Sequence, residues 1–200
     1  MSFFKGIERV GRVLGEASAW PGRLASWLIL PVIVAALWVV IGSMLGVGTI
    51  AQWDEAVLLF SDQLTLTGLV ELQWHLFGVM IMLGGAYALR ENSHVRVDLI
   101  YANVGRKWQR IIDIIGDLVL LLPYCALIAW LSLGFVDMAF RSGEQSDYGG
   151  LADRYLIKAI LPIGLCILFL AGLGRILENL GALLSGSDSE QDKGTQEYNG

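Results

Sequence analysis

Two carboxylates near the start of a long apolar run are the residues best placed to perform chemistry. Asp113 and Asp117 are four residues apart, so a helix places both on one face, and Arg110 precedes Asp113 by nearly one turn. Carboxylates inside a membrane are candidates for a cation site or a proton relay. The alternative is an interfacial pair neutralised by Arg110 and neighbouring basic residues, and the sequence favours this second interpretation.

The two histidines offer little for cofactor chemistry. Haem between membrane helices requires two axial ligands that face each other, whereas His75 precedes and His94 follows the same apolar run. Glu71 lies one turn before His75, and this spacing predicts that the two side chains pair. No group of Cys, His or carboxylates has metal-site spacing, and no catalytic or phosphate-binding motif is present. The sequence therefore predicts no cofactor and no enzymatic activity, and it lacks the basic, aromatic-rich blocks of a nucleic acid partner.

The composition identifies the class of protein that carries these residues. Of the 200 residues, 55% are hydrophobic and only 16% are charged, which is unlike a soluble domain. The apolar residues form runs long enough to cross about 30 Å of hydrocarbon, which takes about 20 helical residues. We expect an all-α polytopic membrane protein with four transmembrane helices, at residues 27–47, 72–89, 113–138 and 157–177. Together they form one membrane domain, residues 1–184, followed by a disordered acidic tail at residues 185–200.

Three segments outside these runs have the pattern of amphipathic helices at the membrane surface. Residues 1–22 place apolar residues at helical spacing between charged ones, with a frayed tail as the alternative. Residues 97–111 place an apolar face opposite Arg106, Lys107 and Arg110. Residues 48–70 contain acidic residues but neither Lys nor Arg. Their apolar residues predict that part of the segment is a helix resting on the outer interface: Trp53, Val57, Leu58, Phe60 and Leu64.

The distribution of basic residues predicts the orientation of the chain. Lys and Arg gather in the N-terminal arm and in residues 90–110, whereas the first expected outer loop has none. Loops rich in Lys and Arg stay in the cytoplasm. We therefore expect both termini inside, an N-in/C-in arrangement, with the acidic tail in the cytoplasm.

One stretch of the chain has the pattern of a known family. Residues 72–101, LQWHLFGVMIMLGGAYALRENSHVRVDLIY, join a span, a Leu-Arg pair, a short polar turn and His-Val-Arg-Val-Asp. A second piece runs from Gly149-Gly150 to Gly164. Over residues 27–180 the chain resembles the small membrane subunits, the DctQ family, of tripartite ATP-independent periplasmic (TRAP) transporters. Leu151-Ala152 departs from the Leu-Pro that is common in one branch of that family.

The resemblance implies a function that the residues alone do not give. It implies a small permease subunit in the bacterial inner membrane that scaffolds a large membrane subunit, while the chain itself binds neither substrate nor metal. A periplasmic binding protein would deliver an organic acid, and an ion gradient would drive uptake. The implied partners are the large TRAP membrane subunit, the periplasmic substrate-binding protein and membrane lipids. The alternative is a membrane anchor subunit of a redox enzyme complex.

Three groups of residues are expected to contact these partners. A small-residue motif, which allows close helix approach in lipid, predicts a packing face at Gly42 and Gly46. The inner turn is expected either to cap the second span or to pair with the large subunit, with lipid phosphate contacts as the alternative, through Arg90, His94, Arg96 and Asp98. The outer loop is expected to meet the binding protein, with an ordinary polar turn and a snorkelling lysine as the alternative, through Glu144, Gly149, Gly150 and Lys158.

Overall fold

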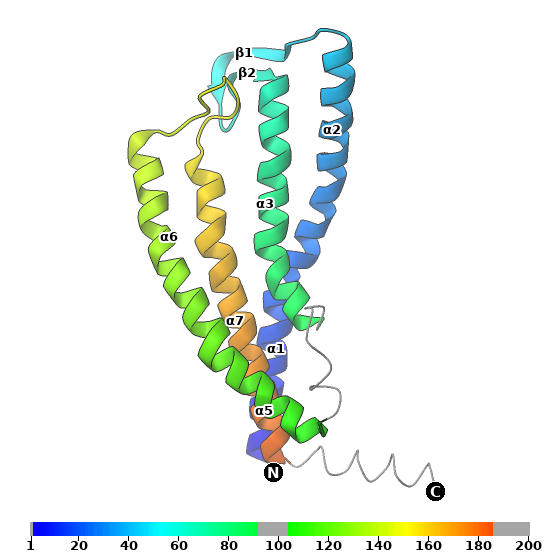
Figure 1. The fold of residues 1–200 in the computed structure, drawn as a ribbon, viewed down its shortest axis with the longest axis vertical. Helices are drawn as coiled ribbons and strands as arrows, with labels where there is room; N and C mark the ends of the chain where they lie inside the picture. Colours follow the sequence, from blue (N-terminus) through cyan, green and yellow to red (C-terminus); the bar gives the residue numbers. More distant parts are fainter. Residues whose placement is uncertain (1, 92–103, 186–200) are drawn as a thin grey trace, which may run out of the picture. The chain divides into compact units, whose positions relative to one another are not determined.

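The computed structural model describes residues 2–91 and 104–185, most of which are helical; two strands among them form one sheet, and loops connect the elements (Figure 1). Four helical stretches in this part of the chain are long and apolar enough to cross a membrane: Phe3–Met44, Leu66–Arg90, Arg106–Ser142 and Tyr155–Ser185. This confirms the predicted all-α membrane fold with four transmembrane helices. His94, Arg96, Asp98 and all of the predicted tail after Ser185 lie outside the described residues.

The four stretches are built from shorter elements. In chain order these are α1 (Ser2–Ala25), the 3-10 turn η1 (Ser26–Leu28), α2 (Ile29–Met44), β1 (Thr49–Val57), β2 (Ser61–Thr65), α3 (Leu66–Arg90), α5 (Arg106–Gly116), the π-helical turn η2 (Asp117–Leu121), α6 (Leu122–Ser142) and α7 (Tyr155–Ser185). Their contacts divide the chain into two compact units. The first unit is Met1–Trp20, Ala86–Ala126 and Cys166–Gly200, and the second is Pro21–Gly85 and Leu127–Leu165.

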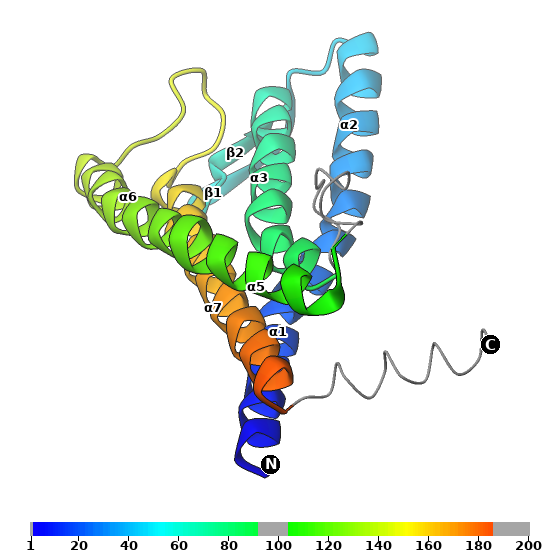
Figure 2. The same ribbon diagram turned by 60° about the horizontal axis from the view of Figure 1, so that its bottom comes forward.

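Helix α7 has neighbours on two sides within the first unit. Helix α1 and helix α5 both run beside its C-terminal part (Figure 2). A small core of buried apolar residues joins the end of α3 to α7 through Ala86, Leu89 and Ala171. The small side chains of Ala86 and Ala171 permit close helix contact, which is how helices associate in lipid.

The second unit also depends on small residues where helices meet. A Cβ atom added to Gly164 of α7 would lie 2.8 Å from the Met82 carbonyl oxygen of α3, so the two helix backbones approach directly. Gly42 of α2 is buried, and an added Cβ there would lie 2.8 Å from the Leu66 side chain. Both glycines therefore serve helix packing within the chain.

The predicted helix within residues 48–70 is wrong for its first part, which forms an antiparallel hairpin. Strand β1 pairs with β2 in a register that aligns Thr49 with Thr65 and Val57 with Ser61, with bulges between. Strand β1 contains Thr, Ile, Val and Trp, which favour extended backbone, and their short apolar pattern does not distinguish strand from helix. Leu59 closes the turn with a φ of 76°, a left-handed conformation that the sequence gives no reason to expect at a leucine.

The amphipathic segments predicted near the termini of the spans are helical where the structure describes them, except that Val104 and Gly105 precede the helix. Helix α1 covers the N-terminal arm and continues through η1 into α2. Helix α5 begins at Arg106, and residues 97–103 of that prediction lie outside the described residues. The continuous helix over residues 2–25 rejects a frayed N-terminal tail.

Candidate functional site

The first of two polar clusters is organised by Glu71, near the start of α3 in the second unit. Its carboxylate accepts hydrogen bonds from the Ser146 hydroxyl at 2.6 Å, the Leu151 backbone N–H at 2.8 Å and the Arg154 guanidinium at 3.1 Å. The Glu71 residue is only 7% exposed, so these donors replace the water that a carboxylate normally binds. We call the four residues the Glu71 cluster. It ties the 143–154 loop to α3.

Gly149 and Gly150 owe their identity to this anchoring. A Cβ atom on Gly150 would clash with the Glu71 carboxyl group, which lies 2.5 Å away at its Cδ atom. Gly149 has a φ of +67°, a left-handed conformation that favours glycine, and its carbonyl accepts a hydrogen bond from Thr65 Oγ1 at 3.0 Å. A hydrogen bond of 2.8 Å from the Ala152 N–H to the Leu59 carbonyl joins the loop to the hairpin turn.

His75 does not use the Glu71 carboxylate, contrary to the predicted side-chain pair. Its Nδ1 atom lies 2.6 Å from the Glu71 backbone carbonyl oxygen, and because that oxygen can only accept, Nδ1 donates. The loop has taken the carboxylate instead. The Nε2 atom of His75 is buried and has no hydrogen-bond partner in the part of the chain that the structure describes.

Lys158 and Glu144 form a second link between the loop and the helices. Lys158 Nζ lies 2.5 Å from a Glu144 carboxylate oxygen and 3.9 Å from the centre of the Phe135 ring. An ammonium group over an aromatic face is stabilised electrostatically in addition to its ion pair. The expected snorkelling lysine is thus held by contacts within the chain.

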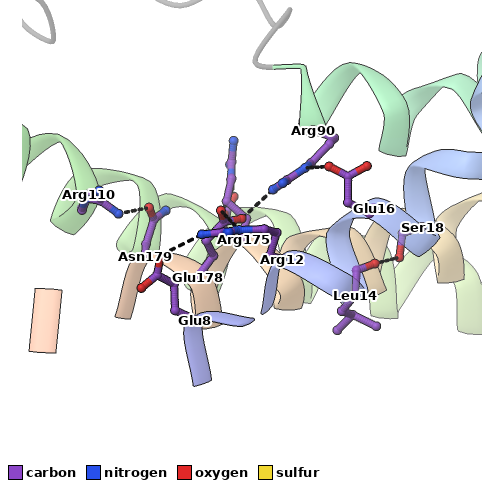
Figure 3. A network of polar contacts seen from close by, with 11 residues as sticks. Glu8, Arg12, Leu14, Glu16, Ser18, Arg90, Arg110, Arg175, Glu178 and Asn179 are labelled. Atoms are coloured by element: carbon purple, nitrogen blue, oxygen red, sulfur yellow. Dashed lines mark hydrogen bonds and ion pairs between the residues drawn. The ribbon is translucent and has the colours of Figure 1, made fainter. Parts of the chain in front are cut away.

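The second polar cluster lies in the first unit and is centred on Arg90, the last residue of α3 (Figure 3). Its guanidinium donates to Glu16 of α1 at 3.1 Å and to Glu178 of α7 at 2.5 Å. Glu178 also lies 3.7 Å from Arg12 of α1, which pairs with Glu8 one turn earlier at 2.9 Å. Arg90 therefore connects three helices, and we call these residues the Arg90 network.

Asp117 has a different partner from the one expected. Its carboxylate forms a two-bond ion pair with Arg175 of α7, in which the Nε bond measures 2.6 Å. Arg110, the predicted partner, instead donates to the Asn179 side chain at 3.5 Å. Asp117 is 2% exposed and opens the π-helical turn η2, a distortion that often occurs at functional positions. Neutralisation by an arginine favours the ion-pair interpretation over a cation site.

A glycine seam brings α1 against α7 beside the Arg90 network. A Cβ atom on Gly174 would lie 2.8 Å from the Gly15 nitrogen and 2.9 Å from the Gly11 carbonyl oxygen. A Cβ atom on Gly181 would lie 2.6 Å from the Glu8 nitrogen. The polar cavity beside the seam measures about 140 Å³ and is lined in part by Arg90, Asp113, Arg175 and Glu178.

The structure separates the predicted interface residues into several sites. Glu144, Gly149, Gly150 and Lys158 come together in or around the 143–154 loop, whereas Arg90 lies in the other unit. Gly46 follows the end of α2 with a φ of +68° and has open space around it, so it is a turn residue and not part of a helix face. Sequence reasoning missed Glu16, Glu178 and Arg175, because nothing local indicates which distant charge each one meets.

No ligand set for a metal emerges from this arrangement. In residues 2–91 and 104–185 there is no group of three or more His, Cys, Asp or Glu side chains that could hold a metal ion. Cys125 is buried and Cys166 is exposed, and both are free thiols. What the two clusters can do is fix helices and a loop relative to their neighbours within each unit.

Comparison with known proteins assigns the chain to a family. The sequence model of the protein family described as the DctQ component of tripartite ATP-independent periplasmic transporters matches residues 58–182. A Pseudomonas aeruginosa protein named C4-dicarboxylate TRAP transporter small permease protein DctQ is 30% identical over 151 residues, which cover 70% of each chain. No solved structure matches. This is a family of transporter permeases and not of enzymes, and its members reside in the inner membrane. The chain therefore belongs to the DctQ family, as the multi-pass small permease component of a TRAP transporter.

Proposed function

We propose that this chain scaffolds the large membrane subunit of its TRAP transporter during ion-gradient-driven uptake of an organic acid. A periplasmic binding protein delivers that acid, and the large subunit carries the substrate and ion sites. The observation that carries the proposal is the family match over residues 58–182. The relative from Pseudomonas aeruginosa bears a C4-dicarboxylate name, which supports a dicarboxylate as the substrate of this system.

The state of the buried charges supports a scaffold. Glu71 and Asp117 are each satisfied by donors of the same chain, and Arg175 and Arg154 are the cations that meet them. A transport site needs charged groups that can exchange partners with a passing ion, whereas these groups hold helices and a loop together. The large apolar side chains along α2 and α6 are exposed instead, ready to meet lipid or a large partner.

The hairpin and the 143–154 loop support docking of a binding protein. A groove of about 470 Å³ lies between them, lined in part by Val57, Leu58 and Asp153. Asp54 and Glu55 are exposed on the adjacent strand. Carboxylates would repel a free organic anion by simple Coulomb interaction, so this surface suits an anion that arrives enclosed in a protein. Glu144, Gly149, Gly150 and Lys158 would hold that surface in shape.

Reconstitution tests the proposal directly. Proteoliposomes that contain this chain, the large subunit and the binding protein should accumulate a radiolabelled C4-dicarboxylate when an inward sodium gradient is imposed. Liposomes that lack this chain, or contain it alone, should not. Uptake by the chain alone, or full uptake without it, would contradict the scaffold role. A haem absorption band from the purified chain would favour the redox anchor instead.

A residue variant separates docking from assembly. Lys158→Ala should lower uptake more than it lowers co-purification with the large subunit, because the Glu144 ion pair shapes the outer loop. The matched control is Arg141→Ala, since Arg141 is exposed and, within the described residues, pairs only with Asp137 one turn away. Equal losses of uptake in both variants would show that Lys158 has no specific role in docking.

A further inference from the structure

The helices of the first unit turn an apolar stripe outward. On α1, Phe3, Val10 and Val13 are exposed, and their spacing places them on one side of the helix. The opposite side of α1 carries Gly11 and Gly15 and packs on α7. The exposed apolar stripe of α1 must be shielded from water by something other than the described part of this chain.

Helix α5 also turns an apolar face outward and a polar face inward. Trp108, Ile112 and Ile115 are exposed on one face, and the same stripe continues through the exposed Val119 of η2 into the span. The polar face points inward, where Arg110 meets Asn179 of α7. The stripe runs without interruption into the surface of a transmembrane stretch. Whatever covers that stretch in the membrane therefore also covers the apolar face of α5.

Cations border both stripes. Lys5, Arg9 and Lys107 are exposed, and within the described residues none of the three forms an ion pair. They differ in this from Arg12, Arg90 and Arg175, whose guanidinium groups are paired inside the first unit. None of the three exposed cations lines the polar cavity of that unit, so they do not converge on one small ion.

We propose that Lys5 and Arg9 of α1 and Lys107 of α5 form a binding surface for anionic phospholipids. The stripes enter the acyl region of one leaflet, and the cations contact headgroup phosphates at its surface. Helices with one apolar face and flanking Lys or Arg bind membranes in this way, and their affinity rises with the anionic lipid content. The continuity of the α5 stripe with the span selects a lipid over a soluble anion.

Lipid selectivity of the full chain tests the proposal. The purified chain is transferred into nanodiscs that contain equal amounts of phosphatidylcholine and phosphatidylglycerol, and native mass spectrometry counts the lipids that remain bound. The wild type should retain phosphatidylglycerol preferentially. Lys107→Gln should lower that preference roughly fivefold, which corresponds to ~1 kcal/mol per basic residue near an anionic surface. The triple variant Lys5→Gln, Arg9→Gln and Lys107→Gln should abolish it.

Two controls keep the result specific. Arg141→Gln removes an exposed cation from the second unit and should leave the preference unchanged, and Lys107→Arg should retain it because the charge remains. If the triple variant does not fold, the Lys107→Gln and Lys107→Arg pair decides the question.

A wild-type preference for neither lipid, unchanged selectivity in Lys107→Gln, or an equal loss in Arg141→Gln would overturn the proposal. Displacement of the bound lipid by inorganic phosphate would overturn it as well, in favour of a soluble anion. The fluorescence of Trp108 is the difference in emission between wild type and Trp108→Phe. Lipids with brominated acyl chains should quench this emission, and a lack of quenching would exclude burial of the α5 stripe in lipid.

Discussion

Glu71 shows how one carboxylate can determine the shape of the 143–154 loop. Glu71→Gln keeps the size of the side chain but places an NH₂ group among three donors from Ser146, Leu151 and Arg154. At least one of these donors then loses its acceptor, at a cost of about 1–3 kcal/mol. We expect a lower unfolding temperature in detergent and faster trypsin cleavage after Arg154.

The matched control for this prediction is Glu55→Gln on strand β1, whose exposed side chain has no such contacts with the residues that the structure describes. Equal unfolding temperatures and equal cleavage rates for the two variants would show that the carboxylate does not anchor the loop.

The ion pair between Asp117 and Arg175 gives a second prediction for single residues. Breaking a buried pair by removing one partner typically costs about 3–5 kcal/mol, because the other charge stays buried without compensation. Asp117→Asn and Arg175→Gln should each destabilise the chain strongly, as measured by chemical unfolding in detergent. The apolar double variant Asp117→Leu with Arg175→Met should recover much of the loss. A double variant less stable than either single one would mean that the pair does not act as a unit.

The candidate site was only partly predictable at this scale. Arg90, Glu144, Gly149, Gly150 and Lys158 stand out because of their positions next to the spans, and the family pattern adds to that. Their contacts do not follow, since Arg90 meets side chains that are 74 and 88 residues away in the chain. Long-range partners depend on which helix faces meet, and hydropathy does not contain that information.

At the scale of elements, the glycine seam between α1 and α7 gives the clearest prediction. A Cβ atom at Gly11 would meet the backbone of α7 at Gly174 and Glu178. Gly11→Ala should therefore push α1 away and expose it to protease, measured as faster trypsin cleavage at Arg9 and Arg12. Gly6→Ala is the matched control, because Gly6 has open space around it and the same gain in helix propensity. Equal protection in the two variants would exclude a tight seam.

The elements themselves were predicted with uneven success. The apolar runs identify all four membrane-crossing helices, because about 20 apolar residues in sequence have few alternatives in a bilayer. The hairpin formed by β1 and β2 was missed. Trp53 and Phe60 suggested one face of a surface helix, but they approach across the hairpin with ring centres 6.3 Å apart. When the apolar residues of a short segment fit both the helical period and the strand period, pairing between strands decides which structure forms.

For the whole molecule, the untested prediction is the N-in/C-in orientation. In a background without Cys125 and Cys166, a cysteine at Leu58 of the hairpin should react with an impermeant maleimide in intact spheroplasts. A cysteine at Lys5 should react only after the membrane is permeabilised. Both sites are exposed, so their reactivity depends on the side of the membrane and not on burial. Labelling of Lys5→Cys in intact spheroplasts would reverse the topology.

The Glu71 cluster has a consequence for biosynthesis. A ribosome completes α3 long before it adds Ser146, Leu151 and Arg154, which follow Glu71 by 75, 80 and 83 residues. During that interval the newly made helix carries an acidic group without its intended donors. The nascent chain must therefore keep the start of α3 near water, or in contact with the insertion machinery, until α6 and the 143–154 loop emerge. A chain released before residue 146 could not form the Glu71 cluster. We expect cellular quality control to remove it faster than a chain released after residue 154.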